Sequence, residues 1–226
     1  MTLVKTCGMS RNADIIAVNK ARPDFVGFVF APSSRQVTFE RAAHLRARLD
    51  SGITPVGVFV NAPVAEVSKL VNDGVIDVAQ LHGDEDENYI KRLRRKLSRG
   101  EIIQVFRIGA DCTSAVLAQA RDSQADMVML DRYDERRYGG SGQSFDWSAV
   151  GDLGRDFFLA GGISAATVSA AIAELHPYAV DASSALEKDG AKDAHLICKF
   201  VSAVRREDAR RRCAGMRMCS DEDVQG

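Results

Sequence analysis

Eight short apolar segments recur along the chain at nearly even intervals, and this repeat constrains the fold more than any other feature. The segments are rich in β-branched residues and lie at 3–8, 25–30, 55–60, 75–82, 101–108, 125–131, 156–162 and 179–186. Apolar residues run on through each segment instead of alternating with polar ones, which is typical of strands buried on both faces. Seven intervals separate the first start from the last, so the mean repeat is about 25 residues.

Stretches with helical periodicity separate these segments, and the alternation calls for a parallel sheet with right-handed crossovers. The helical stretches lie at 12–23, 38–52, 63–74, 86–100, 112–124, 164–175 and 191–206. Eight strands, each followed by a helix at this pitch, predict an α/β fold, the (β/α)8 TIM barrel at near-minimal size. A doubly wound open sheet is the alternative, but it normally has fewer strands and a glycine-rich phosphate loop after the first one. Cys7-Gly8-Met9 stands there instead.

The chain is expected to divide into a barrel domain, 1–206, and a short polar tail, 207–226. The tail has mixed charge, few large apolar residues and no periodicity, so we expect it to be disordered.

Composition excludes several classes of protein. Lys and Arg number 30 against 31 Asp and Glu among 226 residues, and aromatics make up 7%, which argues against a protein that holds nucleic acid. The five cysteines are an odd number without a CxxC pair, so free thiols in a reducing compartment are expected. No apolar run reaches the roughly 18 residues that span a bilayer, and the N-terminus has no signal-peptide layout. We therefore expect a cytoplasmic protein without membrane contact.

The active site of such a barrel lies at the carboxyl ends of its strands, and two of the expected loops there suit a phosphate group. Gly161-Gly162-Ile163-Ser164 follows the seventh strand, and Ser183-Ser184-Ala185 follows the eighth. Backbone N–H groups at the start of a helix are unpaired and carry partial positive charge, so they bind phosphate without a lysine. Either loop alone also suits an ordinary turn, but the two together predict a phosphate site.

Cys7 and Asp131 end the first and sixth strands and are candidate catalytic groups. A thiolate at the barrel mouth is a competent general base if a nearby cation or helix end lowers its pKa. Otherwise a strand cysteine is a small core residue. A carboxylate that ends an apolar strand is costly unless it faces a polar pocket, which favours a functional role over a capping role.

Arg35 and His82 follow the second and fourth strands. The arginine fork can clamp a substrate carboxylate, although a surface arginine fits the sequence equally well. The histidines are scattered, at 44, 82, 176 and 195, without the spacing of metal ligands, so no metal site is expected. The glycine-rich segment 139–147 suits a lid or a loop that shapes the substrate site.

The strand-end motifs together resemble a known family. They are Lys5-Thr6-Cys7-Gly8, Pro32-Ser33-Ser34-Arg35, Gln80-Leu81-His82-Gly83, Leu130-Asp131, Gly139-Gly140-Ser141-Gly142 with Phe145-Asp146-Trp147, Ala160-Gly161-Gly162 and Asp181-Ala182-Ser183-Ser184. In this order, over residues 3 to about 205, the chain resembles the phosphoribosylanthranilate isomerases.

The resemblance implies the Amadori rearrangement of N-(5-phosphoribosyl)anthranilate to 1-(2-carboxyphenylamino)-1-deoxyribulose 5-phosphate in tryptophan biosynthesis. It implies that Asp131 is the general acid that opens the ribose ring and that Cys7 is the general base that takes the proton from C2. Arg35 would hold the anthranilate carboxylate. The other substrate-binding residues implied by the motifs are His82, Gly140, Gly161, Gly162, Asp181, Ser183 and Ser184. Only protons move, so no cofactor is expected, and the expected partner is the phosphorylated aminosugar substrate.

Three features depart from the family pattern. Ser34 replaces a proline, which would leave the arginine loop less rigid. Ala185 replaces a glycine, and its Cβ would crowd the phosphate if that position needs a positive φ. The tail has no counterpart in the family.

Other functions stay open at this point. Indoleglycerol-phosphate synthase would need a catalytic lysine on an inner strand near the mouth, and 25–30 offers none. A sugar-phosphate epimerase would need His and Asp metal ligands at several strand ends. An isomerase that also accepts a histidine-pathway aminoaldose, or a non-catalytic barrel that binds phosphorylated ligands, fits the same pattern. We expect a monomer or a weak homodimer.

Overall fold

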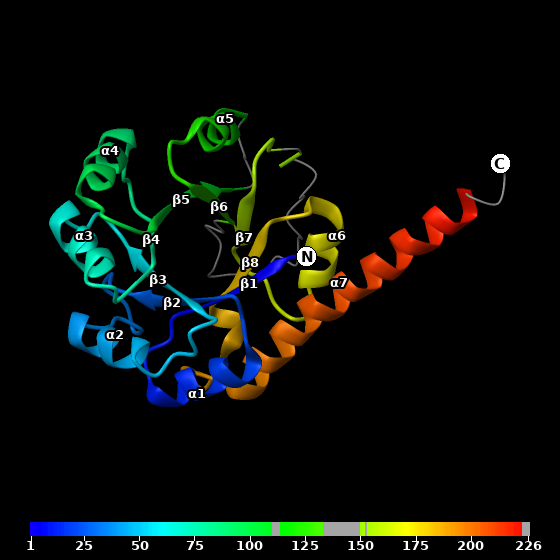
Figure 1. Ribbon diagram of the computed structural model, residues 1–226, viewed down its shortest axis with the longest axis horizontal. Helices are drawn as coiled ribbons and strands as arrows, with labels where there is room; N and C mark the ends of the chain where they lie inside the picture. The colour runs from blue at the N-terminus through cyan, green and yellow to red at the C-terminus, as the bar shows by residue number, and fades with distance from the viewer. Residues whose placement is uncertain (110–113, 133–149, 152, 223–226) are drawn as a thin grey trace.

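Eight parallel strands close into a barrel, in the order in which they follow one another along the chain (Figure 1). The computed structural model describes residues 1–109, 114–132, 150–151 and 153–222, with the backbone alone for 214–222. The strands are β1 Leu3–Cys7, β2 Phe25–Val29, β3 Thr54–Phe59, β4 Val78–Leu81, β5 Glu101–Ile108, β6 Met127–Arg132, β7 Phe157–Ala160 and β8 Ala179–Ala182. The predicted (β/α)8 barrel is confirmed.

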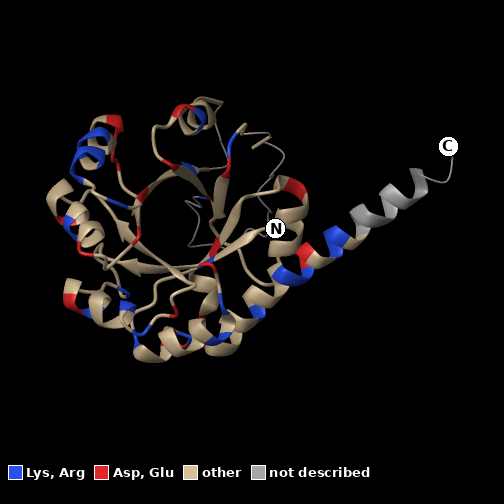
Figure 2. Cartoon of the chain, in the orientation of Figure 1, with Lys and Arg blue, Asp and Glu red and all other residues tan. Residues whose placement is uncertain are grey.

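Helices surround the barrel, as Figure 1 shows. Those described are α1 Asn12–Ala21, α2 Phe39–Arg46, α3 Val64–Asn72, α4 Glu87–Lys96, α5 Ser114–Asp122, α6 Val168–Leu175 and α7 Ala194–Glu222. Acidic and basic residues both lie on these outer helices (Figure 2). The glycine-rich segment 139–147 lies outside the described residues.

The strands bury both faces, as their continuous apolar runs predict. One group of side chains points inward: Phe25 of β2 and Phe158 of β7 meet edge to face with ring centroids 5.3 Å apart, although their strands are not neighbours. The other group, which includes Val4 and Phe28, packs between the strands and the helices. Successive strand residues therefore alternate between the barrel interior and the helix layer.

The eighth predicted segment, 179–186, is only partly a strand. β8 ends at Ala182, a 3-10 turn follows at Ser184–Leu186, and a hairpin pairs β9 Glu187–Lys188 with β10 Ala191–Lys192. The apolar pattern continues because Leu186 is buried, but it is buried from a turn in which its N–H donates to the Ser183 carbonyl at 3.0 Å. An apolar run alone does not separate these two conformations.

Helix α7 continues beyond residue 206, the expected end of the barrel domain. The helix begins at Ala194 and continues to Glu222, and Figure 1 shows it extending past the barrel. Asp208 is buried and accepts two hydrogen bonds from the Thr2 N–H, at 2.9 and 3.1 Å. Arg205 donates to the Thr2 carbonyl at 3.1 Å and pairs with Asp24 at 2.8 Å. The residues just beyond 206 thus belong to the packed base of the barrel, and the Ala, Arg and Met residues that follow are good helix formers.

Within the described part of the chain, no helix combines the length and apolar character that crossing a bilayer requires. The same residues contain no group of three or more His, Cys, Asp or Glu side chains arranged to hold a metal ion.

Candidate active site

A cavity of about 720 Å³ opens at the carboxyl ends of the strands, a volume that suits a small-molecule ligand. The predicted site residues that line it are Cys7, Arg35, His82, Asp131, Gly161, Gly162, Asp181, Ser183 and Ser184. Gly140, also predicted, lies outside the described residues. Barrel closure therefore brings together residues from β1, β6 and β8 and from the loops that follow β2, β4, β7 and β8.

Cys7 is the last residue of β1 and lies beside Gly27 of β2 in the sheet register. A Cβ atom added at Gly27 would lie 2.5 Å from the Cys7 sulfur, well inside van der Waals contact. Glycine at this position therefore leaves the space that the thiol occupies. Cys7 is 7% exposed, and that surface faces the cavity.

A buried ion pair lies below Cys7 inside the barrel. The Lys5 ammonium is 2.9 Å from Asp181 Oδ2, and the Lys5 side chain is fully buried. Burial opposes the charged form of Lys5, but the charges of Asp181 and Cys7 more than offset this, so the pKa of Lys5 is raised. Burial also raises the pKa of the Cys7 thiol, against the pull of the Lys5 charge.

Asp131, at the end of β6, contacts His82 beyond β4. His82 Nε2 is 2.9 Å from Asp131 Oδ2, and both side chains are about one quarter exposed, at 25% and 23%. The Gln80 amide nitrogen lies 3.2 Å from His82 Nδ1. An amide N–H donates to Nδ1, which leaves the imidazole proton on Nε2 to donate to Asp131. Gln80 thus orients His82, and His82 orients the Asp131 carboxyl group, which lines the cavity.

Arg35 lies against the loop that follows β8. Its Nη1 donates to Ser183 Oγ at 2.7 Å, and its Nε is 2.8 Å from Glu187 Oε1. Lys192 contacts the same groups: its ammonium lies 2.8 Å from Glu187 Oε1 and donates to the Ser183 carbonyl at 2.9 Å. Burial lowers the pKa of Lys192, while Glu187 opposes the shift. The β9–β10 hairpin therefore holds Arg35 through Glu187, which Lys192 holds in turn.

The two predicted phosphate loops face the cavity side by side. Gly161 and Gly162 have φ values of 85° and 73°, and a Cβ on Gly161 would lie 2.4 Å from the Arg132 backbone nitrogen, so this position requires glycine. Ala185 is not among the described residues with a positive φ. The alanine at that position thus causes no backbone strain.

The turn that carries Arg35 has Ser34 in place of the family's proline, and hydrogen bonds of Ser33 stabilise it. The Ser33 hydroxyl accepts from the Arg35 N–H at 3.2 Å, and the Ser33 carbonyl accepts from the Gln36 N–H at 3.2 Å. Ser33 thereby holds the turn that carries Arg35.

Sequence reasoning missed several polar residues of the site: Lys5, Gln80, Glu187 and Lys192 did not enter the candidate set. Two of them had a signal in the sequence, because a lysine and a glutamine within apolar strands are costly to bury without a partner. Gln80 Oε1 and Asp181 Oδ1 are buried and accept no hydrogen bond in the described part of the chain. Both residues line the cavity, so these acceptors are available to donors of a bound molecule.

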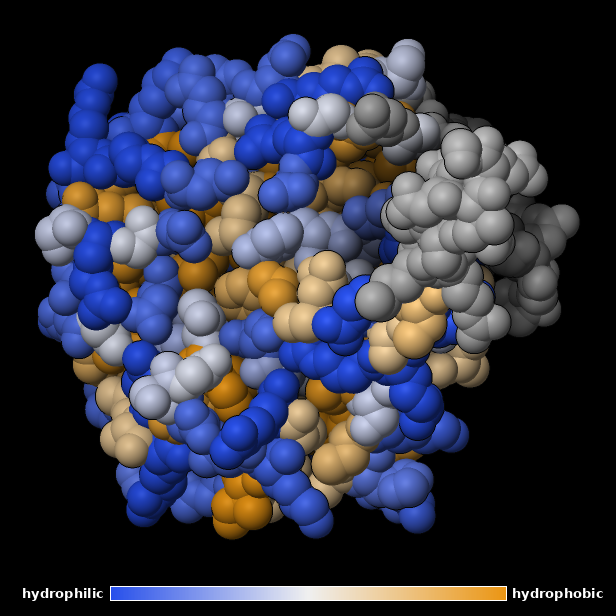
Figure 3. Space-filling model, turned by 45° about the vertical axis from the view of Figure 1, so that its right-hand side comes forward, coloured by the Kyte–Doolittle hydropathy of each residue, from blue (hydrophilic) through white to orange (hydrophobic). Residues whose placement is uncertain are grey.

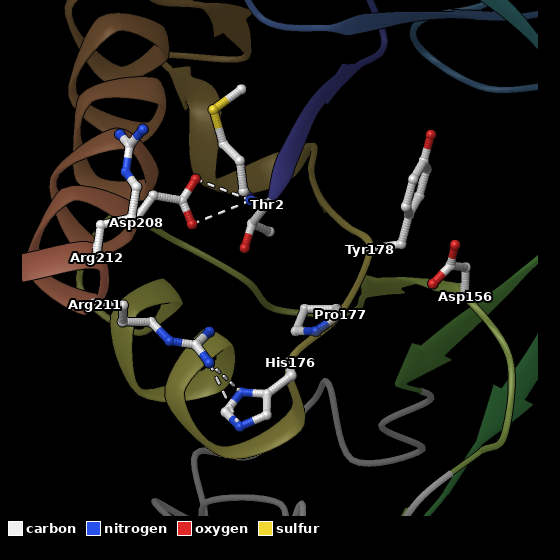
Figure 4. A pocket seen from close by; sticks show the side chains of 9 residues that line it. Thr2, Asp156, His176, Pro177, Tyr178, Asp208, Arg211 and Arg212 are labelled. Atoms are coloured by element: carbon white, nitrogen blue, oxygen red, sulfur yellow. Dashed lines mark hydrogen bonds between the residues drawn. The ribbon is translucent and has the colours of Figure 1, made fainter. Parts of the chain in front are cut away.

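A second cavity, of about 510 Å³, lies at the opposite end of the barrel (Figure 4). Its polar groups bind one another: Asp208 accepts from the Thr2 N–H, and Arg211 Nη2 lies 2.9 Å from His176 Nδ1. This end of the fold carries stability in barrels of this architecture, whereas chemistry occurs at the other end.

Comparisons with known proteins identify the family of this chain. The family profile described as N-(5'-phosphoribosyl)anthranilate (PRA) isomerase matches residues 4–203. An N-(5'-phosphoribosyl)anthranilate isomerase from Endomicrobium trichonymphae is 39% identical over 205 residues, which cover 91% of this chain and 99% of the relative. The crystal structure of phosphoribosyl anthranilate isomerase from Thermotoga maritima matches with a TM-score of 0.79 at 30% identity, over 91% of this chain and 99% of that one.

A further solved structure is phosphoribosyl anthranilate isomerase in complex with reduced 1-(o-carboxyphenylamino)-1-deoxyribulose 5-phosphate. It matches with a TM-score of 0.77 at 27% identity, over 91% of this chain and 99% of that one. With a family profile that spans most of the chain and a relative at 39% identity over nearly its whole length, the chain belongs to the N-(5'-phosphoribosyl)anthranilate isomerase family.

Proposed function

We propose that this protein catalyses the Amadori rearrangement of N-(5-phosphoribosyl)anthranilate to 1-(2-carboxyphenylamino)-1-deoxyribulose 5-phosphate, a step of tryptophan biosynthesis. The observation that carries the proposal is a single cavity lined by Cys7 and Asp131 together with groups suited to an anion. A solved relative at 27% identity binds a reduced form of this product, which supports the same substrate class here.

Asp131 acts first, as the general acid. It gives a proton to the ribose ring oxygen, the bond from C1 to that oxygen breaks, and a protonated imine forms between C1 and the anthranilate nitrogen. His82 Nε2, 2.9 Å from Asp131 Oδ2, donates to this oxygen and orients the carboxyl group, which itself carries the proton that it gives to the ring.

Cys7 acts second, as the general base. Its thiolate removes the proton from C2, and the electron pair moves into a C1–C2 double bond while the imine nitrogen becomes a neutral amine. The resulting enolamine gains a proton at C1 and loses the one on the C2 hydroxyl, which gives the ketone. The atoms of substrate and product are the same, so general acid and base groups suffice for the step.

The charged ends of the substrate set its orientation in the cavity. The phosphate lies against the loops at Gly161-Gly162 and Ser183-Ser184. A 3-10 turn begins at Ser184, whereas the helix that follows Gly162 begins only at Val168. Arg35 takes the anthranilate carboxylate and exchanges part of its contact with Glu187 for it. Asp181 Oδ1 accepts from a sugar hydroxyl.

Turnover of the fluorescent anthranilate substrate by the purified full chain tests the proposal. The wild-type protein is expected to convert it, and Cys7→Ala is expected to lose about 10²-fold or more in kcat with its circular dichroism spectrum unchanged. Substrate binding without any turnover by the wild type would instead favour a non-catalytic barrel. A parallel assay with a histidine-pathway aminoaldose measures whether the enzyme accepts a second substrate.

The surface supports a monomer or a weak homodimer in the cytoplasm. The face in Figure 3 is largely hydrophilic, with apolar residues in small separate groups. The large apolar side chains that are most exposed in the described structure are Met1, which precedes β1, Ile16 in α1, and Val60, which follows β3. The unpaired thiols of Cys7, Cys198 and Cys213 suit a reducing compartment.

A further inference from the structure

The buried Lys5–Asp181 ion pair has no part in the two proton transfers described above, yet it lies directly below them. Lys5 is 0% exposed and Asp181 is 8% exposed, and they lie side by side in the register of β1 and β8. A buried ion pair loses hydration that its mutual attraction recovers only in part, and apolar residues of similar volume often replace such a pair at no loss of stability. Stability alone therefore does not account for a lysine inside the barrel.

Lys5 and Cys7 both point into the barrel interior. The two residues are separated by one position on β1, so their side chains point to the same face of the sheet. That face is the barrel interior, because Cys7 and Asp181 both line the cavity. The long Lys5 side chain extends from the layer below, and its charge acts on the Cys7 thiol.

Three charged groups act on Cys7 in the described structure. Lys5 comes from its own strand, Asp181 from β8 and Lys192 from β10, whereas β2 presents only Gly27. Lys192 shares its ammonium with Glu187 and the Ser183 carbonyl, and burial lowers its pKa. Lys5 is the stronger cation at this position, since its interaction with Asp181 keeps it protonated.

We propose that Lys5 is a positioning residue for Cys7: its ammonium group, held in place by Asp181, stabilises the Cys7 thiolate that removes the C2 proton. The inference rests on the proposed role of Cys7 as the base. The opposing action of burial and of the Lys5 charge on the thiol pKa is consistent with it. Asp181 has two effects, because its charge holds Lys5 but also repels the thiolate.

The test measures thiolate formation directly, by the pH dependence of iodoacetamide alkylation at Cys7, followed on the Cys7 peptide by mass spectrometry. Lys5→Met removes the charge at similar length and is expected to slow alkylation at neutral pH about 10-fold or more, because an adjacent opposite charge shifts a pKa by about one to three units. Lys5→Arg keeps the charge and is expected to keep the wild-type profile.

Circular dichroism checks that each variant is folded. The double variant Lys5→Met/Asp181→Asn is a second control, because it removes both buried charges and leaves neither unpaired. A profile of the folded Lys5→Met variant that coincides with wild type overturns the proposal. So does a Lys5→Arg profile as shifted as that of Lys5→Met, since the charge would then not be the cause. If Cys7→Ala keeps full turnover while the alkylation profiles shift as expected, the role of Cys7 as base fails and the charge effect of Lys5 stands.

Discussion

The two ends of the barrel hold cavities of comparable size, about 720 and 510 Å³, but their polar groups differ in what they bind. At the carboxyl end, the buried acceptors Gln80 Oε1 and Asp181 Oδ1 receive no hydrogen bond from the described residues. At the amino end, both Asp208 oxygens accept from Thr2. Buried groups that stay unpaired in the protein suit a ligand, whereas paired groups hold the fold together. Mutations should therefore change rate at one end and stability at the other.

The largest effect is expected for Asp131→Asn at the carboxyl end. The amide keeps the shape but cannot deliver a proton, so kcat should fall about 10²- to 10⁴-fold in the fluorescence assay. The melting temperature should stay close to that of wild type, because the side chain is partly exposed. Turnover near the wild-type value would remove Asp131 as the acid.

Gly27→Ala should also act on rate, by displacing the base. The added methyl group would lie 2.5 Å from the Cys7 sulfur, and a displacement of the thiol by an ångström is expected to lower kcat by up to about 10²-fold. Gly52→Ala is the matched control, since its nearest neighbour in the same test is Asp50 at 3.5 Å. Equal kcat values for the two variants would contradict this account of Gly27.

The pH dependence of kcat/KM tests the assignment of Cys7, at the carboxyl end, as the base. Burial raises the pKa of Cys7, so the inactive thiol predominates at neutral pH and kcat/KM should rise about tenfold per pH unit until the thiolate forms. The raised pKa of Cys7 also contributes to the free energy of unfolding. This contribution is complete below the ordinary thiol pKa and is lost as the pH rises through the raised pKa. A flat rate profile from neutral to alkaline pH would contradict the assignment of Cys7.

At the amino end, Asp208→Ala should lower stability without changing KM. It leaves the buried Thr2 N–H without its acceptor, at a cost of about 1–3 kcal/mol in the free energy of unfolding by urea. Asp156→Ala is the control, because this carboxylate lines the same cavity but is exposed. A larger loss of activity than of stability in Asp208→Ala would break the division between the two ends.

The smallest effect is expected for Arg211→Gln. Its guanidinium contacts the exposed His176 and the Ile172 carbonyl, and such surface contacts contribute about 0–1 kcal/mol. Thermal unfolding should register at most this change. Destabilisation as large as that of Asp208→Ala would show that the helix α7 contacts at this end act as a unit.

The fold was largely predictable because its signal is local and repeated. An apolar run predicts each strand, and eight such runs at an even spacing are compatible with few folds other than the (β/α)8 barrel. Cys7, Asp131 and the loops after β7 and β8 were predictable for the same reason, since they stand where such runs end. The end of β8 and the extent of α7 were not predictable. A turn with apolar residues has the same sequence pattern as a strand, and a polar helix has the composition of a disordered tail.

By itself, the amino-acid sequence determined the number of strands, their order around a barrel and many of the residues at its mouth. Only the tertiary structure decided which side chains of the site contact one another. Lys5 meets Asp181, His82 meets Asp131 and Arg35 meets Glu187 across separations of 176, 49 and 152 residues along the chain. Periodicity reports which face of an element is buried, but which charge lies opposite another depends on how the closed barrel sets the register of its strands.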